Sequence, residues 1–198
     1  RHRFVMSDAV TSIIVLISGN GSNLQAIIDA IESNQLNVTI ACVISNNPNA
    51  YGLERAQKHH IPIHVIAPIK NETRESYDRR LIDSIEQYTA KLIVLAGFMR
   101  ILGAYFVQRY HGKLINIHPS LLPKYPGLKT HEKVIANGDD IHGCTIHYVT
   151  EAVDSGAVIA QAKLIVGKNE TASQLKSRVH ALEHTLYPEV IQQLCQSK

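Results

Sequence analysis

An amide and an imidazole lie two residues apart near the middle of the chain, at Asn116 and His118 in the run KLINIHP, residues 113–119. Apolar and polar side chains alternate there, so a strand presents Asn116 and His118 on one face. An amide N–H can stabilise a developing oxyanion, and an imidazole can hold or move a proton near neutral pH. Taken alone, this spacing is more typical of a buried histidine that bonds a neighbouring amide.

The loop after His118 favours a functional site over a buried structural histidine. Residues 119–127 read PSLLPKYPG and contain three prolines, which predicts a stiff loop. The carboxyl ends of parallel strands open onto the binding crevice of an α/β sheet, where an ordered loop suits a pre-organised site. Further on, Asp154 stands two residues before Gly156 in a short connection. A turn residue is the ordinary interpretation of such an aspartate, since glycine permits a sharp reversal there.

A glycine-containing turn, SGNGSN at residues 18–23, follows the first apolar run. A small turn onto a helix N-terminus exposes backbone N–H groups beside the positive end of the helix dipole, which suits a phosphate. The dinucleotide fingerprint would need a glycine in place of Leu24, and the P-loop would need a lysine, so both fail. A monophosphate-sized anion site remains; the alternative is a tight turn that only needs glycine at positive φ. Ser22 and Gln25 have the spacing of a capping box.

Short apolar runs alternate with amphipathic runs along most of the chain. The apolar runs predict strands at 12–17, 38–44, 61–66, 92–96 and 113–118, and the amphipathic ones predict helices near 24–31, 51–59, 73–88, 128–137 and 172–196. Two β-rich runs, 143–150 and 157–166, have only a loop between them, which predicts antiparallel pairing or separate places in the sheet. The expected fold is α/β with three layers: a mostly parallel twisted sheet, helices on both faces, a Rossmann-like N-terminal half and a partly antiparallel C-terminal part.

The composition of the chain limits the classes of protein to which it can belong. The chain has 198 residues, 45% of them hydrophobic, with a net charge of +3 and no Trp, so it offers little material for a nucleic-acid surface. Three cysteines without metal or redox spacing argue against a disulfide framework, and the longest apolar run, 92–99, is too short to span a membrane. We therefore expect a cytoplasmic protein with a single domain over residues 12–198. Residues 1–5 precede Met6, match no element and are interpreted as foreign to that domain.

Three motifs occur together in one order: the GNGSN turn, the run NIHPSLLPKYPG from Asn116 to Gly127, and the run GCTIHYV that leads to Asp154 and Gly156. The chain resembles the folate-dependent formyltransferases in these motifs, from about Ser12 to Gln193. The resemblance implies the formyltransferase fold and a reaction in purine synthesis. In it, the amine of glycinamide ribonucleotide attacks the formyl carbon of the co-substrate 10-formyltetrahydrofolate through a tetrahedral intermediate. It further implies no metal, no nucleic-acid or membrane partner, and a monomer or homodimer.

Two alternatives stay open. One is another reaction on the same fold, hydrolysis of formyltetrahydrofolate or formylation of initiator tRNA, although such relatives usually carry a further domain for which 198 residues leave no room. The other is a nucleotide-binding module without catalysis.

The resemblance also assigns residues. Asn116 would donate to the oxyanion, His118 would stabilise that charge or move a proton, and Asp154 would hold His118 or order a water. The expected phosphate and ribose contacts are Gly21, Ser22, Asn23 and Glu183. The expected folate-binding residues are Arg74, Met99, Arg100, Ile101, Leu102 and Asn116.

The remaining polar residues have more ordinary interpretations. Arg178 and His180 could add charge near the phosphate or belong to a solvated helix face. The helix at 51–60, with Arg55, is expected to be solvated. His142 and His147, five residues apart in a strand, are expected on opposite faces as surface or structural residues, and none of the histidines has metal-site spacing.

Overall fold

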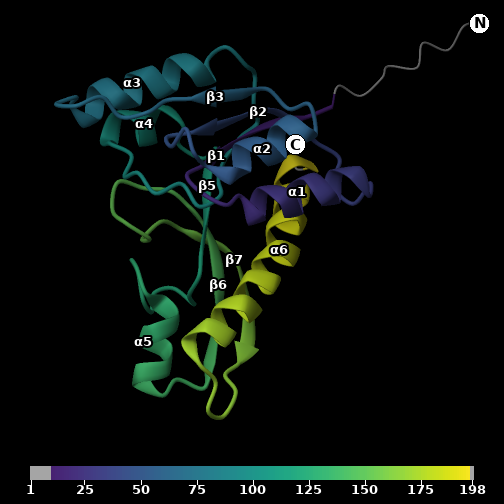
Figure 1. Cartoon of the computed structure of the whole chain (residues 1–198), viewed down its shortest axis with the longest axis vertical. Coiled ribbons are helices and arrows are strands. Elements are labelled where there is room, and N and C mark those ends of the chain that lie inside the picture. Colours follow the sequence, from purple (N-terminus) through teal and green to yellow (C-terminus); the bar gives the residue numbers. More distant parts are fainter. Residues whose placement is uncertain (1–9, 197–198) are drawn as a thin grey trace, which may run out of the picture.

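The structure is a computed structural model that describes residues 10–196, so residues 1–5 lie outside the described part. One seven-stranded sheet in the order β3-β2-β1-β4-β5-β6-β7 organises it (Figure 1). The strands are β1 Ser12–Ile17, β2 Thr39–Ser45, β3 Ile63–Val65, β4 Leu92–Leu95, β5 Leu114–His118, β6 Ile141–Tyr148 and β7 Val158–Ile165. The helices are α1 Ser22–Glu32, α2 Tyr51–Lys58, α3 Arg74–Ile85, α4 Ala104–Arg109, α5 Thr130–Asn137 and α6 Ala172–Gln196.

The sheet is parallel from β3 to β5 and antiparallel from β5 to β7, which confirms the expected fold class. The chain builds β1, β2 and β3 outward and then returns to place β4 on the other side of β1. Such a reversal of strand order opens a crevice at the carboxyl ends of the strands. The turns after β1, β4 and β5 therefore share one edge of the sheet.

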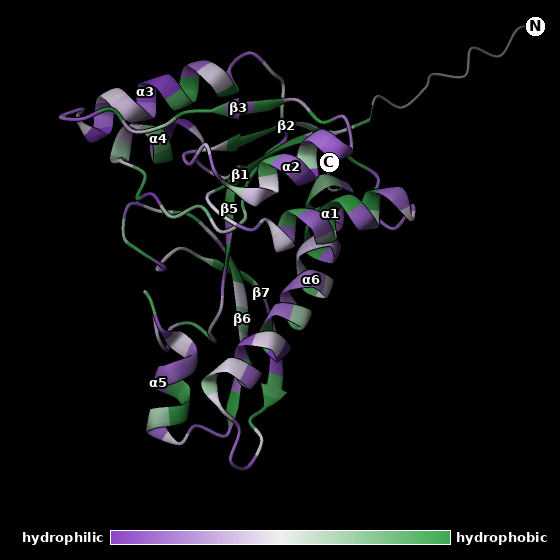
Figure 2. Cartoon of the chain, viewed as in Figure 1, coloured by the Kyte–Doolittle hydropathy of each residue, from purple (hydrophilic) through white to green (hydrophobic). Residues whose placement is uncertain are grey.

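Two apolar cores cover the two faces of the sheet, because successive strand residues point to opposite sides. In β1, Ile13, Val15 and Ile17 join one core, and Ile14 and Leu16 join the other. Helices α1, α2 and α6 supply the first core and α3 and α4 the second. Figure 2 shows the hydrophobic residues concentrated on the strands and on stripes of the helices, with hydrophilic residues between.

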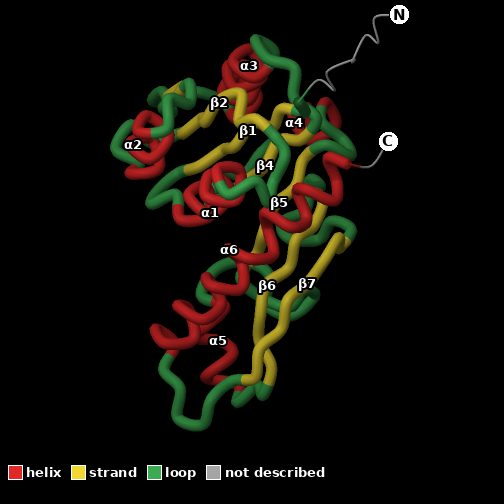
Figure 3. Tube along the Cα trace, turned by 90° about the vertical axis from the view of Figure 1, so that its right-hand side faces the viewer, coloured by secondary structure: helices red, strands yellow, loops and turns green. Residues whose placement is uncertain are grey.

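The antiparallel strands β6 and β7 extend beyond the parallel part of the sheet. His118, the last residue of β5, pairs with Thr145, so residues 141–144 of β6 continue past the end of β5. Figure 3 shows β6 and β7 extending away from the other strands, with α5 beside them and the long α6 running along both parts of the sheet. The sheet therefore has a parallel part, covered by α1 to α4, and an antiparallel part made by β6 and β7.

One local prediction is wrong. Ser22 and Gln25 form no capping box, since the N-cap of α1 is Gly21 at φ 77° and no side chain caps the helix. No helix among residues 10–196 is long and apolar enough to cross a membrane.

Candidate active site

The structure brings the three expected catalytic side chains together. Asn116 and His118 share one face at the carboxyl end of β5, and His118 Nδ1 lies 3.4 Å from Asp154 Oδ2. Asn116 Nδ2 lies 3.4 Å from His147 Nε2, which is itself 3.6 Å from Asp154 Oδ1. The cluster contains an amide, two imidazoles and a carboxylate, which are groups able to stabilise charge and to transfer protons.

Hydrogen bonding fixes the orientation of the His118 ring. Its Nε2 lies 2.8 Å from the carbonyl oxygen of Tyr125. A carbonyl oxygen only accepts, so Nε2 carries a proton in this arrangement. The other nitrogen, Nδ1, faces the carboxylate of Asp154. The surroundings therefore accommodate a ring protonated on both nitrogens, with a carboxylate to balance its charge.

Asp154 occupies a restricted position in the loop between β6 and β7. Its φ is 51°, in the left-handed region, which aspartate tolerates better than most residues. Its Oδ2 accepts a hydrogen bond of 2.9 Å from the backbone N–H of Gly127. Burial would raise the pKa of Asp154, but hydrogen bonds from His147 and Gly127 and the positive charge of the nearby imidazoles hold this pKa below its ordinary value. The residue thus makes its turn and also presents an ionised carboxylate to His118.

His147 is a member of the cluster that the sequence interpretation missed. Only 3% of this residue and 1% of His142 are exposed, so of the two expected positions, surface or structural, the surface one does not hold. Antiparallel pairing of β6 with β5 places His147 opposite Asn116. The signal was therefore available, because pairing the two predicted strands in that register would have put His147 on the face that carries Asn116 and His118.

The glycine turn meets a second glycine from the next helix. A Cβ on Gly21 would lie 2.7 Å from the Cα of Gly52 in α2, closer than real Cβ contacts. Gly52 also donates its N–H to the carbonyl oxygen of Gly19 at 3.0 Å. The first turn of α1, with Ser22 and Asn23, has no acidic side chain, and the first amides of a helix have no partner within it. The first amides of α1 could therefore donate to an anion, and the phosphate site at this turn stays a prediction.

Arg55 contradicts the expectation that α2 is merely solvated. Its guanidinium donates to the backbone oxygen of Asn20 at 2.8 Å and to the side-chain oxygen of the same residue at 2.9 Å. A third bond, of 3.2 Å, reaches Gln25 in α1. Arg55 thus ties α2 to the glycine turn and places a positive charge beside it.

Glu183 approaches the same turn from α6 and is 4% exposed. Asn23 donates a hydrogen bond to it, yet Oε2 of Glu183 and Oδ1 of Asn23 are buried without a partner among the described residues. Burial raises the pKa of Glu183 to about 7, and the bond from Asn23 offsets only part of that effect. Two unsatisfied acceptors side by side are suited to a ligand that brings hydrogen-bond donors.

The expected folate-binding residues lie in and beside the segment after β4. Met99 and Ile101 are 73% and 52% exposed, whereas Leu102 is buried in the core, so only its backbone is available. Arg74 begins α3 and its side chain passes close to Gly103, at the end of this segment. The guanidinium of Arg100 lies 3.7 Å from the centre of the Tyr77 ring. The segment offers the two exposed apolar side chains of Met99 and Ile101, and it follows β4, whose Leu95 pairs with Asn116.

Two further side chains hold that segment in place. The hydroxyl of Ser18 accepts a hydrogen bond of 2.8 Å from the Met99 N–H, which joins the segment to the glycine turn. The carboxylate of Asp78, fully buried, accepts one of 2.8 Å from the Gly103 N–H. The turns after β1 and β4 are therefore a connected unit.

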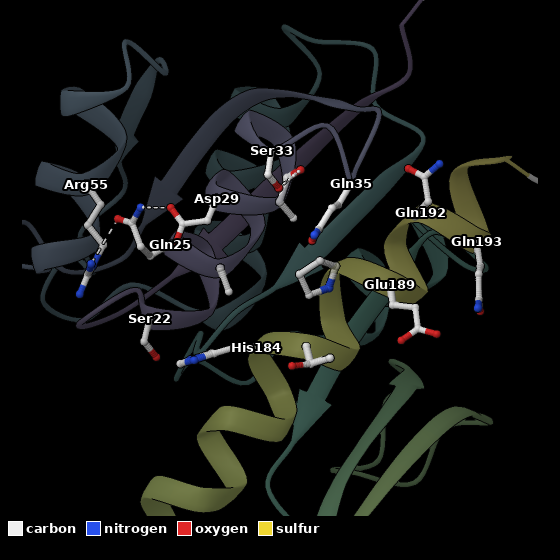
Figure 4. A pocket seen from close by; sticks show the side chains of 14 residues that line it. Ser22, Gln25, Asp29, Ser33, Gln35, Arg55, His184, Glu189, Gln192 and Gln193 are labelled. Carbon is white, nitrogen blue, oxygen red and sulfur yellow. Dashed lines mark hydrogen bonds between the residues drawn. The ribbon is translucent and has the colours of Figure 1, made fainter.

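A groove of about 1010 Å³ runs between α1 and α6 and begins at the glycine turn. Figure 4 shows Ser22 and His184 close to one another at one end of it and Gln192 and Gln193 at the other. The groove is not lined by Asn116, His118 or Asp154. Arg178, one of the two residues considered for extra charge at the phosphate, instead bonds the Glu170 carboxylate at 2.8 Å.

The fold is an α/β sheet with a glycine turn after β1 and a neighbouring cluster of Asn, His and Asp side chains at the carboxyl ends of its strands. The family model described as formyl transferase matches residues 11–191, and the chain belongs to that family.

Individual relatives agree. The chain is 51% identical over 180 residues to a phosphoribosylglycinamide formyltransferase of Escherichia coli (strain K12), which covers 91% of this chain and 85% of that protein. A solved structure of a phosphoribosylglycinamide formyltransferase from Coxiella burnetii matches with a TM-score of 0.89 at 53% identity, over 93% of this chain and 86% of that one. The glycinamide ribonucleotide transformylase 1 from Symbiobacterium toebii matches with a TM-score of 0.92 at 36% identity, over 98% and 92% of the two chains. The resemblance seen in the sequence is confirmed.

Proposed function

We propose that this chain transfers the formyl group of 10-formyltetrahydrofolate to the amine of glycinamide ribonucleotide, giving formylglycinamide ribonucleotide and tetrahydrofolate in purine biosynthesis. The observation that carries the proposal is the meeting of Asn116, His118 and Asp154 on the edge of the sheet that also holds the glycine turn. Relatives named for this reaction over most of their length support it. A single domain, residues 12–198, would carry the activity.

The proposed chemistry needs no covalent enzyme intermediate. The substrate amine attacks the formyl carbon, a C–N bond forms, and the carbonyl electron pair moves onto oxygen. Asn116 donates its amide N–H to that oxyanion, a contact typically worth about 2.7 to 4 kcal/mol. The intermediate collapses when the bond to the folate nitrogen breaks, and the proton lost by the amine ends on that nitrogen. His118 stabilises the charge as imidazolium or moves the proton, and Asp154 holds the ring or orders a water.

We expect the two substrates to bind on either side of the cluster, at groups that lack a hydrogen-bond partner. The phosphate would sit on the backbone of Gly21, Ser22 and Asn23 at the amino end of α1. A ribose hydroxyl would donate to the free oxygen of Glu183. The folate would lie against the segment 99–102, with its ring edge on the main chain and Arg74 near its acidic tail.

One assay separates this function from the alternatives. The protein is incubated with a 10-formyl folate, with and without glycinamide ribonucleotide, and the release of deformylated folate is followed by absorbance. We expect release only when the amine substrate is present. Release without it would indicate the hydrolase, and binding of the ribonucleotide without turnover would indicate a non-catalytic module.

The same assay tests the two residues of β5. Asn116→Ala should lower kcat by about 10²- to 10³-fold, and His118→Ala by about 10²- to 10⁴-fold, because both act on charge that develops in the transition state. KM for the ribonucleotide should change little in both variants, whereas Asn116→Ala should also raise KM for the folate modestly, since Asn116 is among the expected folate-binding residues. A rise in KM with kcat preserved would contradict the catalytic assignment.

A further inference from the structure

The carbonyl group that bonds His118 belongs to a residue in an unfavourable backbone conformation. Tyr125 has φ 56°, in the left-handed region, which a bulky aromatic residue seldom adopts. Its carbonyl oxygen accepts from His118 Nε2 at 2.8 Å and from the Ser120 hydroxyl at 2.9 Å. A conformation of this kind persists only where the surroundings hold it.

The side chain of Tyr125 is held at its far end. Its hydroxyl donates to Oδ2 of Asp139 at 2.6 Å and accepts from the Asn137 amide at 3.0 Å. Asn137 is the last residue of α5, and Asp139 follows directly after its C-cap. A hydrogen bond to an ionised carboxylate is shorter and stronger than one between neutral groups. Tyr125 is therefore fixed both at its carbonyl oxygen and at its hydroxyl, between β5 and the end of α5.

We propose that Asp139 is a positioning residue for the reaction: through the Tyr125 hydroxyl it fixes the carbonyl oxygen that keeps a proton on Nε2 of His118 and directs Nδ1 towards Asp154. Asp139 does not touch the reacting atoms and acts only through this chain of contacts. The inference rests on the proposed function for the role of His118, but the geometry of the ring does not depend on that function.

A merely structural role is the competing interpretation. Asp139 also lies 3.7 Å from the Lys124 ammonium, so it contributes to the stability of the loop in any case. A residue that only stabilised the loop would lower the melting temperature when replaced and leave the turnover of the folded enzyme unchanged. A positioning residue lowers turnover in protein that is fully folded.

The first test compares Tyr125→Phe and Asp139→Ala, which remove the same hydrogen bond from its two ends, with the double variant. We expect each single variant to lower kcat by about tenfold or more, since a displacement of the ring by about 1 Å can cost about 10²-fold. KM for both substrates should stay within about threefold. The double variant should be no worse than the poorer single variant, because both act through one contact.

A matched control lies elsewhere in the chain. Tyr110 donates its hydroxyl to Glu86 at 2.8 Å, a similar tyrosine and carboxylate pair remote from His118. Tyr110→Phe should leave kcat unchanged. Tyr125→Phe keeps the ring and its packing, so this variant tests the proposal even if Asp139→Ala proves unstable.

The second test reads the His118 ring directly and needs no substrate. Nitrogen NMR, with the signals assigned by their loss in His118→Gln, should show the neutral ring of the wild type protonated on Nε2. Tyr125→Phe and Asp139→Ala should show a mixture of both tautomers. An unchanged tautomer, or turnover within about twofold of the wild type in both variants, would overturn the proposal. If the wild type transfers no formyl group, the proposed function fails, and the tautomer comparison still decides whether Asp139 positions the ring.

Discussion

Two largely buried carboxyl groups lie in different parts of the site, and their pKa values are shifted in opposite directions. Asp154, in the loop after β6, has its pKa held below the ordinary value although burial alone would raise it. Glu183, on α6 beside the glycine turn, has its pKa raised to about 7. Asp154 receives hydrogen bonds from Gly127 and His147 and faces a second imidazole, whereas Glu183 receives one bond, from the neutral amide of Asn23.

The contrast shows that the supply of donors, more than burial, decides the charge of a carboxyl group here. The Asp154 region has its own donors and stays charged, as a group that balances an imidazolium must. The Glu183 region lacks donors, and a ligand with hydroxyl groups would supply them. Environments that move the pKa values of two groups apart commonly separate their roles, and we propose a charge-balancing role for Asp154 and a ligand-binding role for Glu183.

The largest expected effect comes from Asp154→Asn, which removes the charge of the Asp154 carboxylate and keeps the shape of the side chain. We expect kcat to fall by about 10²- to 10⁴-fold, the range for loss of a group that supports proton transfer. Folding should be preserved, because the amide oxygen of Asn can still accept from the Gly127 N–H. The measurement is kcat together with the melting temperature at pH 7. Turnover near the wild-type value would leave Asp154 as a turn residue only.

Gly21→Ala tests the region around Glu183, because the Gly21 turn places Asn23. The added Cβ would meet the Gly52 backbone at 2.7 Å, so we expect a loss of stability of roughly 2 to 4 kcal/mol, among the large single-residue effects. KM for the ribonucleotide should rise more than KM for the folate. The control is Gly112→Ala, which has the same φ of 77° but nothing within 4 Å of its Cβ. Equal effects of both variants on stability would show that φ alone matters, and equal rises in both KM values would indicate general distortion.

Glu183→Gln should change the stability of the fold by an amount that depends on pH. The pKa of Glu183 is raised in the folded state, so the folded protein keeps a proton that the unfolded chain loses between its ordinary pKa and about 7. Wild-type stability should therefore fall as pH rises through that window. Glutamine does not titrate, so its free energy of unfolding lacks this pH dependence. The difference in free energy of unfolding between variant and wild type should therefore shift in favour of the variant by roughly 1 to 3 kcal/mol from pH 4 to pH 8.

Thermal unfolding at the two pH values measures this gain. Glu189→Gln, an exposed position on the same helix, is the control and should show no such difference. A gain of the same size at both pH values would contradict ionisation of Glu183 as its cause.

The sequence predicted what depends on local periodicity. The strands and most of the helices follow from apolar spacing, although helix α4, Ala104–Arg109, was not predicted. The shared face of Asn116 and His118 follows from the two-residue repeat of a strand. The resemblance linked Asp154 to His118, 36 positions apart, and the structure places them 3.4 Å from one another. The catalytic roles of these residues stay predictions.

The contacts that the sequence did not predict all join separate elements. Gly52 looks like an ordinary helix residue until α2 is packed against the glycine turn. His147 reaches the site only through antiparallel pairing of two strands, and Tyr125 contacts His118 through a backbone atom that carries no side-chain signal. The missing capping box has a similar cause, because the left-handed Gly21 already begins the helix. Such features depend on three-dimensional packing, which a reading of local spacing cannot supply.

The continuous sheet restricts how this enzyme could enclose its substrates. The parallel part and the β6–β7 part belong to one hydrogen-bonded sheet, with β5 and β6 paired where they meet, and α6 runs along both parts. Rigid rotation of one part against the other would break that pairing, so we do not expect hinge closure of two lobes. We expect exclusion of water to depend instead on the connections 119–129 and 149–157, which place Tyr125 and Asp154 beside His118. The same short segments would then set both the geometry of the reacting groups and the rate at which products leave.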